Sequence, residues 1–135
     1  STGAQGGQIT TAALSDYTED TFTITGTGFT ANPTGTASYI KIGNLVVLEI
    51  PTLSGTSNAT AFGLTGIPAA IQATQNMQGF SVAVTNSGTL QSAPGMIRIR
   101  TGGTDWDVFL DFSRAVFTGS GTKGLENCCL TYLLT

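Results

Sequence analysis

Apolar residues are densest between Tyr39 and Pro51. Two β-rich runs, residues 38–42 and 45–50, flank Gly43-Asn44, and glycine at the first of two central positions suits a tight hairpin turn. Because side chains alternate along a strand, one face of this hairpin carries Tyr39, Lys41, Val46, Leu48 and Ile50, and the other carries Ile40, Ile42, Leu45 and Val47. Both faces are mostly apolar, so we expect a second sheet of the same chain on one side and more core or a neighbouring subunit on the other. The candidate subunit-interface residues are Tyr39, Lys41, Val46 and Leu48.

A second hairpin is predicted around Gly102-Gly103. A two-residue turn there places Arg100 opposite Asp105 and Arg98 opposite Asp107, so two pairs of opposite charge fall on one face. The other face carries the apolar side chains of Ile97, Ile99, Trp106, Val108, Leu110 and Phe112.

Further strands follow from apolar–polar alternation at residues 20–25, 79–86 and 127–134, and turns rich in Gly, Pro, Asn and Ser separate them. Only residues 69–75 could form a helical turn. About eight or nine strands predict an all-β protein, an antiparallel β-sandwich of jelly-roll type or a barrel. Residues 1–15 are small and weakly patterned, so we expect a linker or the end of an upstream stalk there and a β-sandwich head over residues 16–135.

The composition predicts a polar surface with little charge. The 135 residues include 5 basic and 8 acidic side chains, a net charge of −3, while 24 threonines and 18 glycines leave much of the surface polar but uncharged. An acidic, lysine-poor surface argues against nucleic acid as a partner, and no apolar run is long enough to predict membrane insertion. We therefore expect neither of these partners.

The chain contains no histidine, which removes Ser-His-Asp and Cys-His catalysis and every histidine-containing metal site. Acidic residues are too few to favour a calcium cage, so we expect no metal and no cofactor. Cys128 and Cys129 are adjacent, and a strand would point them to opposite faces, where we expect small buried or half-buried side chains. A vicinal disulfide and an intersubunit contact are the alternatives.

The candidate ligand-binding residues are Arg98, Arg100, Asp105, Trp106 and Asp107. Carboxylates two residues apart on a strand lie ~6.6 Å apart, within the range of a glycosidase pair. Guanidinium groups beside them stabilise the ionised form, whereas a general acid must carry a proton, so we expect no enzyme and no catalytic residue. Two interpretations stay open: a charge ladder that helps to set the hairpin register, or a surface that recognises sugar hydroxyls or acidic sugars. Trp106 belongs to the core by alternation, or forms a sugar platform near the hairpin tip.

Three segments carry a resemblance to a known family: DYTEDTFT at residues 16–23, YIKIGNLV at 39–46 and LTGIP at 64–68. Their order resembles the C-terminal modules of tailed-bacteriophage tail fibres and related prophage structural proteins. Such modules often show an acidic Tyr-Glu lead into a strand, a hairpin of the form Y-x-K/R-I/V-G-x-x-V and an I/L-x-G-L-P turn. Here Ile67 stands where leucine is usual, and Thr18 separates Tyr17 from Glu19. The resemblance covers residues 16–68, and the second half matches only in strand rhythm.

The resemblance implies a homotrimeric head at the tip of a phage fibre, joined to an upstream shaft. Such a head is a non-enzymatic receptor-binding protein of the virion, made in the bacterial cytoplasm, that attaches to a surface polysaccharide or lipopolysaccharide. A second hypothesis is a trimerisation or capping module with no ligand of its own. A third, an extracellular ligand of the tumour-necrosis-factor or complement-globular kind, would share the fold but usually brings a signal or a collagen-like stalk, and this sequence shows neither.

Overall fold

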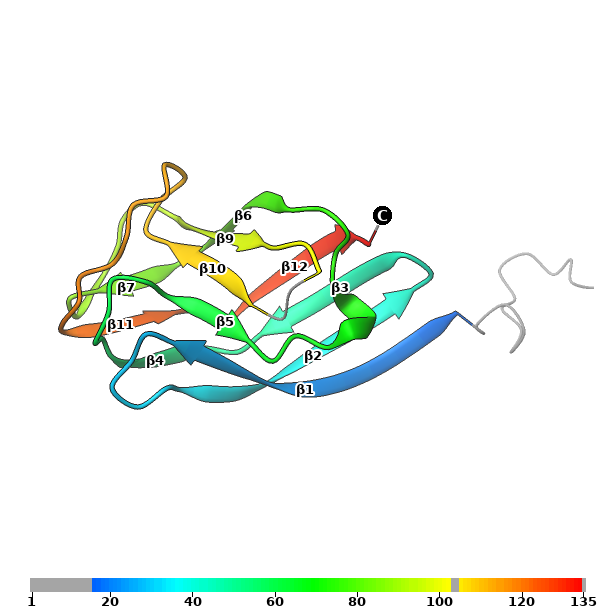
Figure 1. The fold of residues 1–135 in the computed structure, drawn as a ribbon, viewed down its shortest axis with the longest axis horizontal. Helices are drawn as coiled ribbons and strands as arrows, with labels where there is room; N and C mark the ends of the chain where they lie inside the picture. Colours follow the sequence, from blue (N-terminus) through cyan, green and yellow to red (C-terminus); the bar gives the residue numbers. More distant parts are fainter. Residues whose placement is uncertain (1–15, 103–104, 135) are drawn as a thin grey trace, which may run out of the picture.

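The computed structural model describes residues 16–102 and 105–134, which contain twelve strands and one short 3₁₀ helix. The strands are β1 (Tyr17–Thr27), β2 (Thr34–Ile42), β3 (Leu45–Ile50), β4 (Leu53–Thr56), β5 (Gly63–Thr65), β6 (Met77–Val82), β7 (Val84–Asn86), β8 (Thr89–Leu90), β9 (Gly95–Ile99), β10 (Trp106–Phe109), β11 (Thr122–Leu125) and β12 (Cys128–Leu133); the helix is η2 (Ala69–Ile71). Eight strands form one antiparallel sheet in the order β12-β3-β2-β1-β5-β10-β9-β6, and four form a small sheet in the order β4-β11-β7-β8 (Figure 1). The predicted all-β antiparallel class is confirmed. No helix within these residues is long and apolar enough to cross a membrane.

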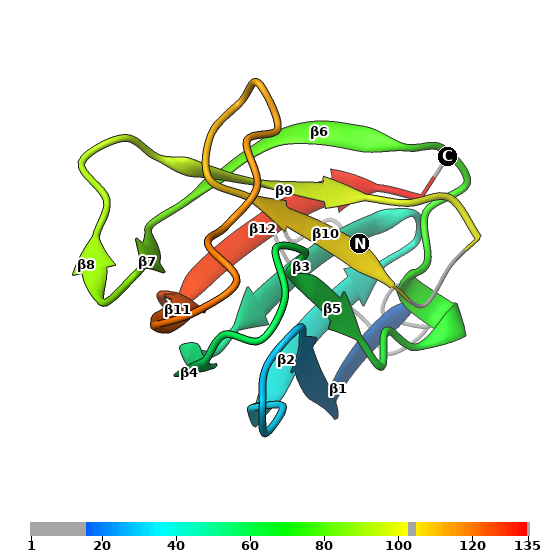
Figure 2. The same cartoon turned by 60° about the vertical axis from the view of Figure 1, so that its left-hand side comes forward.

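The large sheet curves until its two end strands approach each other (Figure 2). The ring centroids of Phe80 on β6 and Tyr132 on β12 are 6.3 Å apart, and Trp106 on β10 lies 5.9 Å from the same tyrosine ring. The Tyr132 hydroxyl donates a hydrogen bond of 2.7 Å to the carbonyl of Ile71, at the end of η2. The nearly closed sheet therefore encloses one core, and η2 covers part of it.

The β2–β3 hairpin has the register that its Gly43-Asn44 turn predicts. Tyr39 pairs with Leu48, and Ile42 pairs with Leu45. Gly43 has a φ of +56°, a left-handed conformation that favours glycine. Because β1 pairs with β2 and β12 pairs with β3, the hairpin forms the centre of a four-stranded ribbon with one face toward the core and one toward the outside.

The residues predicted to contact a second subunit lie on the inner face of this ribbon. Tyr39, Val46 and Leu48 are 6%, 0% and 0% exposed and belong to the core of the single chain, and Lys41 on the same face is half-buried. Tyr39, Val46 and Leu48 are therefore not accessible to a second copy, which corrects the prediction for these three residues, whereas a subunit contact of the half-buried Lys41 stays a prediction. Alternation identified two apolar faces of the hairpin but carries no information about which one turns inward.

The alternating run at residues 79–86 divides between the two sheets. β6 ends at Val82 in the large sheet, and β7 begins at Val84 in the small one. Both valines are buried while Ser81 and Ala83 are exposed, so the predicted alternation holds although the strand is interrupted. Gly95 allows β9 to pass closely here, since a Cβ would come within 2.6 Å of Val84 Cγ1. Such divisions raise the predicted eight or nine strands to twelve in the described residues.

A buried lysine connects the small sheet to loops of the large one. Lys123 on β11 is 0% exposed, and its ammonium group donates three hydrogen bonds to backbone carbonyls while facing three phenylalanine rings. The acceptors are the carbonyls of Gly28 (2.8 Å), Ala59 (3.0 Å) and Ala61 (2.8 Å), and the ring centroids are those of Phe29 (4.7 Å), Phe62 (5.5 Å) and Phe117 (5.9 Å). Burial lowers the pKa of Lys123 to about 8. Carbonyl dipoles and aromatic faces thus stabilise this charge in place of a carboxylate.

Trp106 lies in the core and is 0% exposed, which confirms the core alternative and corrects its place among the candidate ligand-binding residues. Its Nε1 has no hydrogen-bond partner within the described residues. The two cysteines are free thiols on β12, with Cys128 half-buried and Cys129 exposed. The expected burial therefore fails for Cys129, because its side chain lies on the outer face of the strand.

Candidate functional site

The charged hairpin is formed by β9 and β10, and the register predicted near its base is confirmed. Arg98 pairs with Asp107, and Ile97 pairs with Val108. Alternation then turns Ile97 and Val108 into the core, where both are buried, and Arg98 and Asp107 outward. Gly103, the second residue of the predicted turn, lies outside the described residues.

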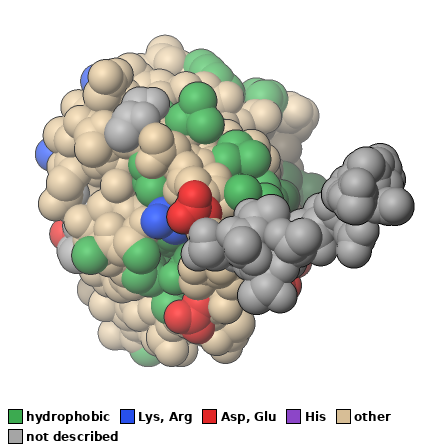
Figure 3. Space-filling view, turned by 90° about the vertical axis from the view of Figure 1, so that its right-hand side faces the viewer, with side chains coloured by type: hydrophobic (Ala, Val, Ile, Leu, Met, Phe, Trp, Pro, Cys, Tyr) green, Lys and Arg blue, Asp and Glu red, His purple; other side chains and the backbone are tan. Residues whose placement is uncertain are grey.

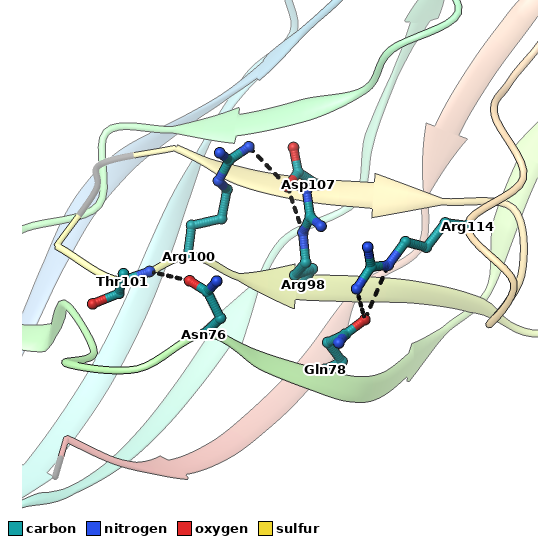
Figure 4. A network of polar contacts seen from close by, with 7 residues as sticks. All are labelled: Asn76, Gln78, Arg98, Arg100, Thr101, Asp107 and Arg114. Atoms are coloured by element: carbon teal, nitrogen blue, oxygen red, sulfur yellow. Dashed lines mark hydrogen bonds and ion pairs between the residues drawn. The ribbon is translucent and has the colours of Figure 1, made fainter.

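Both arginines of the hairpin converge on one carboxylate (Figure 4). Arg98 donates to Asp107 Oδ2 from Nε at 2.9 Å and from Nη2 at 2.6 Å, and Arg100 Nη1 lies 3.4 Å from the same oxygen. The side chains of Arg98 and Asp107 are only 21% and 26% exposed, whereas that of Arg100 is 54% exposed. Arg98 is therefore held by Asp107, while most of the Arg100 guanidinium faces solvent.

Phe109 supports the inner guanidinium from the side. The Cζ atom of Arg98 lies 5.3 Å from the centroid of the Phe109 ring, within the range of a cation–π contact. Phe109 is half-buried on the outward face of β10, two residues after Asp107. An aromatic surface and a fixed charge thus lie side by side on this strand.

A groove of about 270 Å³ runs beside Arg100, across β10 and β5 and the end of β1. Its walls combine charged, hydroxyl and apolar groups. The lining residues are Thr27, Thr60, Ala61, Phe62, Gly63, Arg100, Asp105, Trp106, Asp107, Val108, Phe109 and Val116. Gly63 keeps the floor low, because a Cβ there would come within 2.6 Å of the Thr27 hydroxyl oxygen.

The loop after β10 brings Val116 to this groove. Asp111 closes the loop by accepting hydrogen bonds at Oδ1 from Ser113 Oγ (2.7 Å), Ser113 N (2.9 Å) and Ala115 N (3.2 Å). These bonds, the Ser113 hydroxyl first, lower the pKa of Asp111. Val116 follows this turn and is 56% exposed, so its side chain provides an apolar wall opposite the charged strand.

A third arginine, Arg114, lies in the loop after β10 and outside the groove. Arg114 donates from Nε at 3.1 Å and from Nη2 at 2.7 Å to Gln78 Oε1, and Asn76 accepts a bond of 2.8 Å from Thr101 N (Figure 4). Sequence reasoning missed both contacts, because residues 36 and 25 positions apart give no local signal of contact. Val116 was missed for the same reason.

The structure thus divides the five predicted ligand-binding residues into three groups. Arg100, Asp105 and Asp107 line the groove. Arg98 donates hydrogen bonds to Asp107 and does not line the groove. The indole of Trp106 is buried beneath the groove and offers no accessible face.

This arrangement is suited to binding. An exposed guanidinium can pair with a carboxylate, hydroxyls of Thr27 and Thr60 can bond to a polyol, and the faces of Phe109 and Val116 can contact its C–H groups. Asp107 is committed to contacts with two guanidinium groups, so its carboxylate holds the arginines in place. Within the described residues, no three His, Cys, Asp or Glu side chains are grouped to hold a metal ion.

Comparison with known proteins found one curated relative and several similar structures. No family model matches the chain. The chain is 31% identical over 137 residues to structural protein V8 of Sputnik virophage, and the match covers 96% of this chain and 74% of that protein. Its fold is similar to that in the crystal structure of a reovirus attachment protein, sigma1, in complex with alpha-2,3-sialyllactose, with a TM-score of 0.50, 11% identity, and coverage of 88% of this chain and 67% of that one. At 11% identity this second likeness concerns the fold alone.

Proposed function

The chain belongs to the family of structural protein V8 of Sputnik virophage, and from this premise we propose that it is an attachment head of the virion that binds a host glycan in the groove beside Arg100. The family makes it a viral structural protein of the virion. The resemblance to tail-fibre modules agrees with that relationship at this level, a viral structural protein, whereas the relative comes from a virophage and not from a tailed phage.

The observation that carries the proposal is the composition of the groove. An exposed guanidinium lies beside an aromatic ring, an apolar wall and two threonine hydroxyls, within one depression of about 270 Å³. Those groups recognise a saccharide that carries a carboxylate. The similar fold of a reovirus attachment protein, crystallised with alpha-2,3-sialyllactose, supports an acidic sugar as the ligand class.

The role is a binding role, without catalysis. Asp107 is engaged by Arg98 and Arg100, so its carboxylate is not free to act on a substrate. The named relatives, a viral structural protein and a viral attachment protein, support this choice.

The narrower form of the proposal is a homotrimeric fibre tip that joins an upstream shaft and binds a bacterial surface polysaccharide. Its support is the order of the three sequence segments at residues 16–23, 39–46 and 64–68. The similar fold of a reovirus attachment protein in complex with alpha-2,3-sialyllactose makes a sialylated glycan the competing ligand. Both kinds of saccharide therefore belong in the binding experiment.

The second candidate function is a structural module that contacts other virion proteins and has no glycan ligand. The observation that favours it is the apolar outer face of the β2–β3 hairpin, where Ile42 is 51% exposed and Leu45 is 37% exposed. Exposed apolar patches of this kind mark contact surfaces between proteins. A chain that binds no saccharide but is needed for particle assembly would favour this function.

A glycan array tests the main proposal. We expect binding to sialylated or uronic-acid saccharides and weaker or no binding to neutral ones. Arg100→Gln removes the exposed guanidinium and should weaken binding at least about tenfold, as expected for loss of a charge-assisted contact. Arg114→Gln removes the same charge outside the groove and serves as the matched control. No binding to any saccharide, or an equal loss in both variants, would contradict the proposal.

A further inference from the structure

The outer face of the ribbon formed by β1, β2, β3 and β12 carries apolar side chains in register. At the end nearest the hairpin turn, one cross-strand row contains Tyr17, Ile42, Leu45 and Leu133, and the next contains Glu19, Ile40, Val47 and Thr131. In the first row, Ile42, Leu45 and Leu133 are 51%, 37% and 55% exposed. Hydrophobic side chains are exposed at this end of the molecule, around a few charged ones (Figure 3). An antiparallel sheet of a single domain normally turns a polar face to water, so this face is suited to covering by a partner.

A groove of about 510 Å³ continues from these rows along the same ribbon. Apolar atoms of Ile40 and Val47 form its floor, and carboxylates border it. Its remaining lining residues are Glu19, Asp20, Thr21, Ser38, Tyr39, Glu49 and Cys129. The groove crosses β1, β2, β3 and β12 over two neighbouring cross-strand rows, so an extended peptide segment would lie across the strands.

The carboxylates of the groove have no cationic partner within the described residues. Among the described residues, Glu49 accepts hydrogen bonds from Ser38 Oγ and Asn127 Nδ2, both at 3.3 Å, and Asp20 accepts one from the backbone N–H of Thr21. Both ion pairs of the described chain involve Asp107, on another part of the sheet.

None of the five basic residues faces this groove. The three arginines lie on or beside β9 and β10, Lys123 is buried under β11, and Lys41 alternates toward the inner face of β2. A second copy of the chain placed on the same face would add like charges to like charges and supply no cation, which disfavours self-association there.

We propose that this outer face docks an extended segment of another virion protein, one that carries lysine or arginine side chains among apolar ones. The apolar rows bury the apolar side chains, and Glu19 and Glu49 pair with the cations. The proposal rests on the virion role given above but is independent of the glycan groove, since the two grooves share no lining residue.

Binding of synthetic peptides tests the proposal on the full chain. The probe is a fluorescent octapeptide of alternating valine and lysine, and an alternating valine–glutamate octapeptide is its control. We expect the valine–lysine peptide to bind, with an affinity that falls as salt rises, and the valine–glutamate peptide not to bind. The double change Glu19→Gln and Glu49→Gln should weaken binding at least about tenfold, the loss expected for removing charge pairs at a partly buried surface.

Matched variants separate this face from general attraction to an acidic protein. Glu126→Gln removes an exposed carboxylate outside the groove and should leave peptide binding unchanged. Ile42→Ser should weaken peptide binding, while Leu90→Ser, at an exposed leucine of β8, should not.

Equal binding by wild type and the double glutamate variant would overturn the proposal. Light scattering that shows self-association abolished by Ile42→Ser but not by Leu90→Ser would also overturn it, because the face would then join copies of the chain. Glycan binding by the same variants stays unchanged if the two sites are separate, so failure of either proposal can be recognised alone.

Discussion

At the scale of single residues, the position of Asp107 shows where pairing rules succeed and where they end. A two-residue turn correctly sets Arg98 opposite Asp107, because hairpin register is a local property. Arg100 was expected opposite Asp105, but strand β9 ends one residue earlier, at Ile99. Arg100 Nη1 lies 3.4 Å from Asp107 Oδ2. A long side chain that follows the last paired residue of a strand can reach more than one neighbour, and apolar–polar alternation does not predict which one it contacts.

Lys123 is the residue that sequence reasoning missed altogether. Its three carbonyl acceptors lie 62 to 95 residues away in sequence, so no local sequence motif predicts these hydrogen bonds. Gly28 O also accepts from Asn58 N, and Ala59 O also accepts from Ser57 Oγ, but Ala61 O has no second donor within the described residues. The ammonium group therefore supplies the one donor that the Ala61 carbonyl has within the described residues.

We predict that Lys123→Met lowers the free energy of unfolding by about 2 to 3 kcal/mol. The methionine fills most of the space among the three phenylalanine rings but leaves the Ala61 carbonyl without a donor. Urea denaturation of both proteins measures the difference. An unchanged midpoint would show that the three carbonyl bonds add no net stability.

The lowered pKa of Lys123 predicts how this contribution depends on pH. Burial lowers the pKa from 10.5 to about 8, so between these values the unfolded chain binds more protons than the folded one. The stability that Lys123 contributes should therefore rise as the pH increases from 8 to 10.5, by up to roughly 3 kcal/mol. Thermal melts of wild type and Lys123→Met at each pH give the difference. Taking this difference removes the opposite effect of Cys128, whose pKa burial raises to about 11, and that of Tyr132, whose pKa burial also raises. A difference that does not change with pH would contradict the lowered pKa.

At the scale of elements, local signals predicted strands and hairpins well and sheet membership poorly. Gly43-Asn44 and the alternation around it fixed the β2–β3 register, and residues 69–75 do contain a 3₁₀ turn. Alternation did not predict that β6 and β7 belong to different sheets, because a valine buried in either sheet gives the same apolar–polar pattern. It also did not tell which face of the hairpin is the inner one. Both choices depend on contacts between distant segments.

Two glycines with positive φ provide a matched test of close approach between elements. Gly66 has a φ of +98°, and a Cβ there would lie 2.6 Å from the Thr23 carbonyl oxygen; Gly43 has a φ of +56° and open space around it. We predict that Gly43→Ala costs about 1 kcal/mol, the usual cost of a left-handed alanine, and that Gly66→Ala costs at least about twice as much. If chemical denaturation shows the same loss of unfolding free energy for both variants, then β1, which carries the Thr23 carbonyl, shifts away from the new methyl group without a free-energy cost.

At the scale of the whole molecule, the two proposed binding surfaces lie on different parts of one sheet. The groove beside Arg100 lies where β10, β5 and the end of β1 meet, and the apolar face lies along the other half of β1 and its neighbours β2, β3 and β12. The sequence identified the arginines and aspartates of the first surface from their hairpin. For the second surface, the sequence indicated only that the β2–β3 hairpin has two apolar faces, and the face predicted as the interface was the inner one. The carboxylate and thiol that border the outer face, Glu19 and Cys129, come from strands far away in the sequence, so no local pattern indicated them.

The proposed fibre-tip arrangement predicts a homotrimer in solution. Light scattering on a size-exclusion column should give a mass near three times the 13.8 kDa of one chain. Ile42→Ser should leave that mass unchanged, because the face that carries Ile42 is assigned to a different protein. A monomer at every concentration would refute the trimer but would leave the glycan groove untested by that result.

The most direct test of the central claim is a map of backbone amide chemical shifts on titration with the strongest saccharide of the array. We predict that shifts concentrate at residues around the groove, including Thr27, Gly63, Asp105 and Phe109, and that Arg100→Gln abolishes them at the same saccharide concentration. Shifts confined to the outer face of β1, β2, β3 and β12, or no shifts at all, would contradict attachment through this groove.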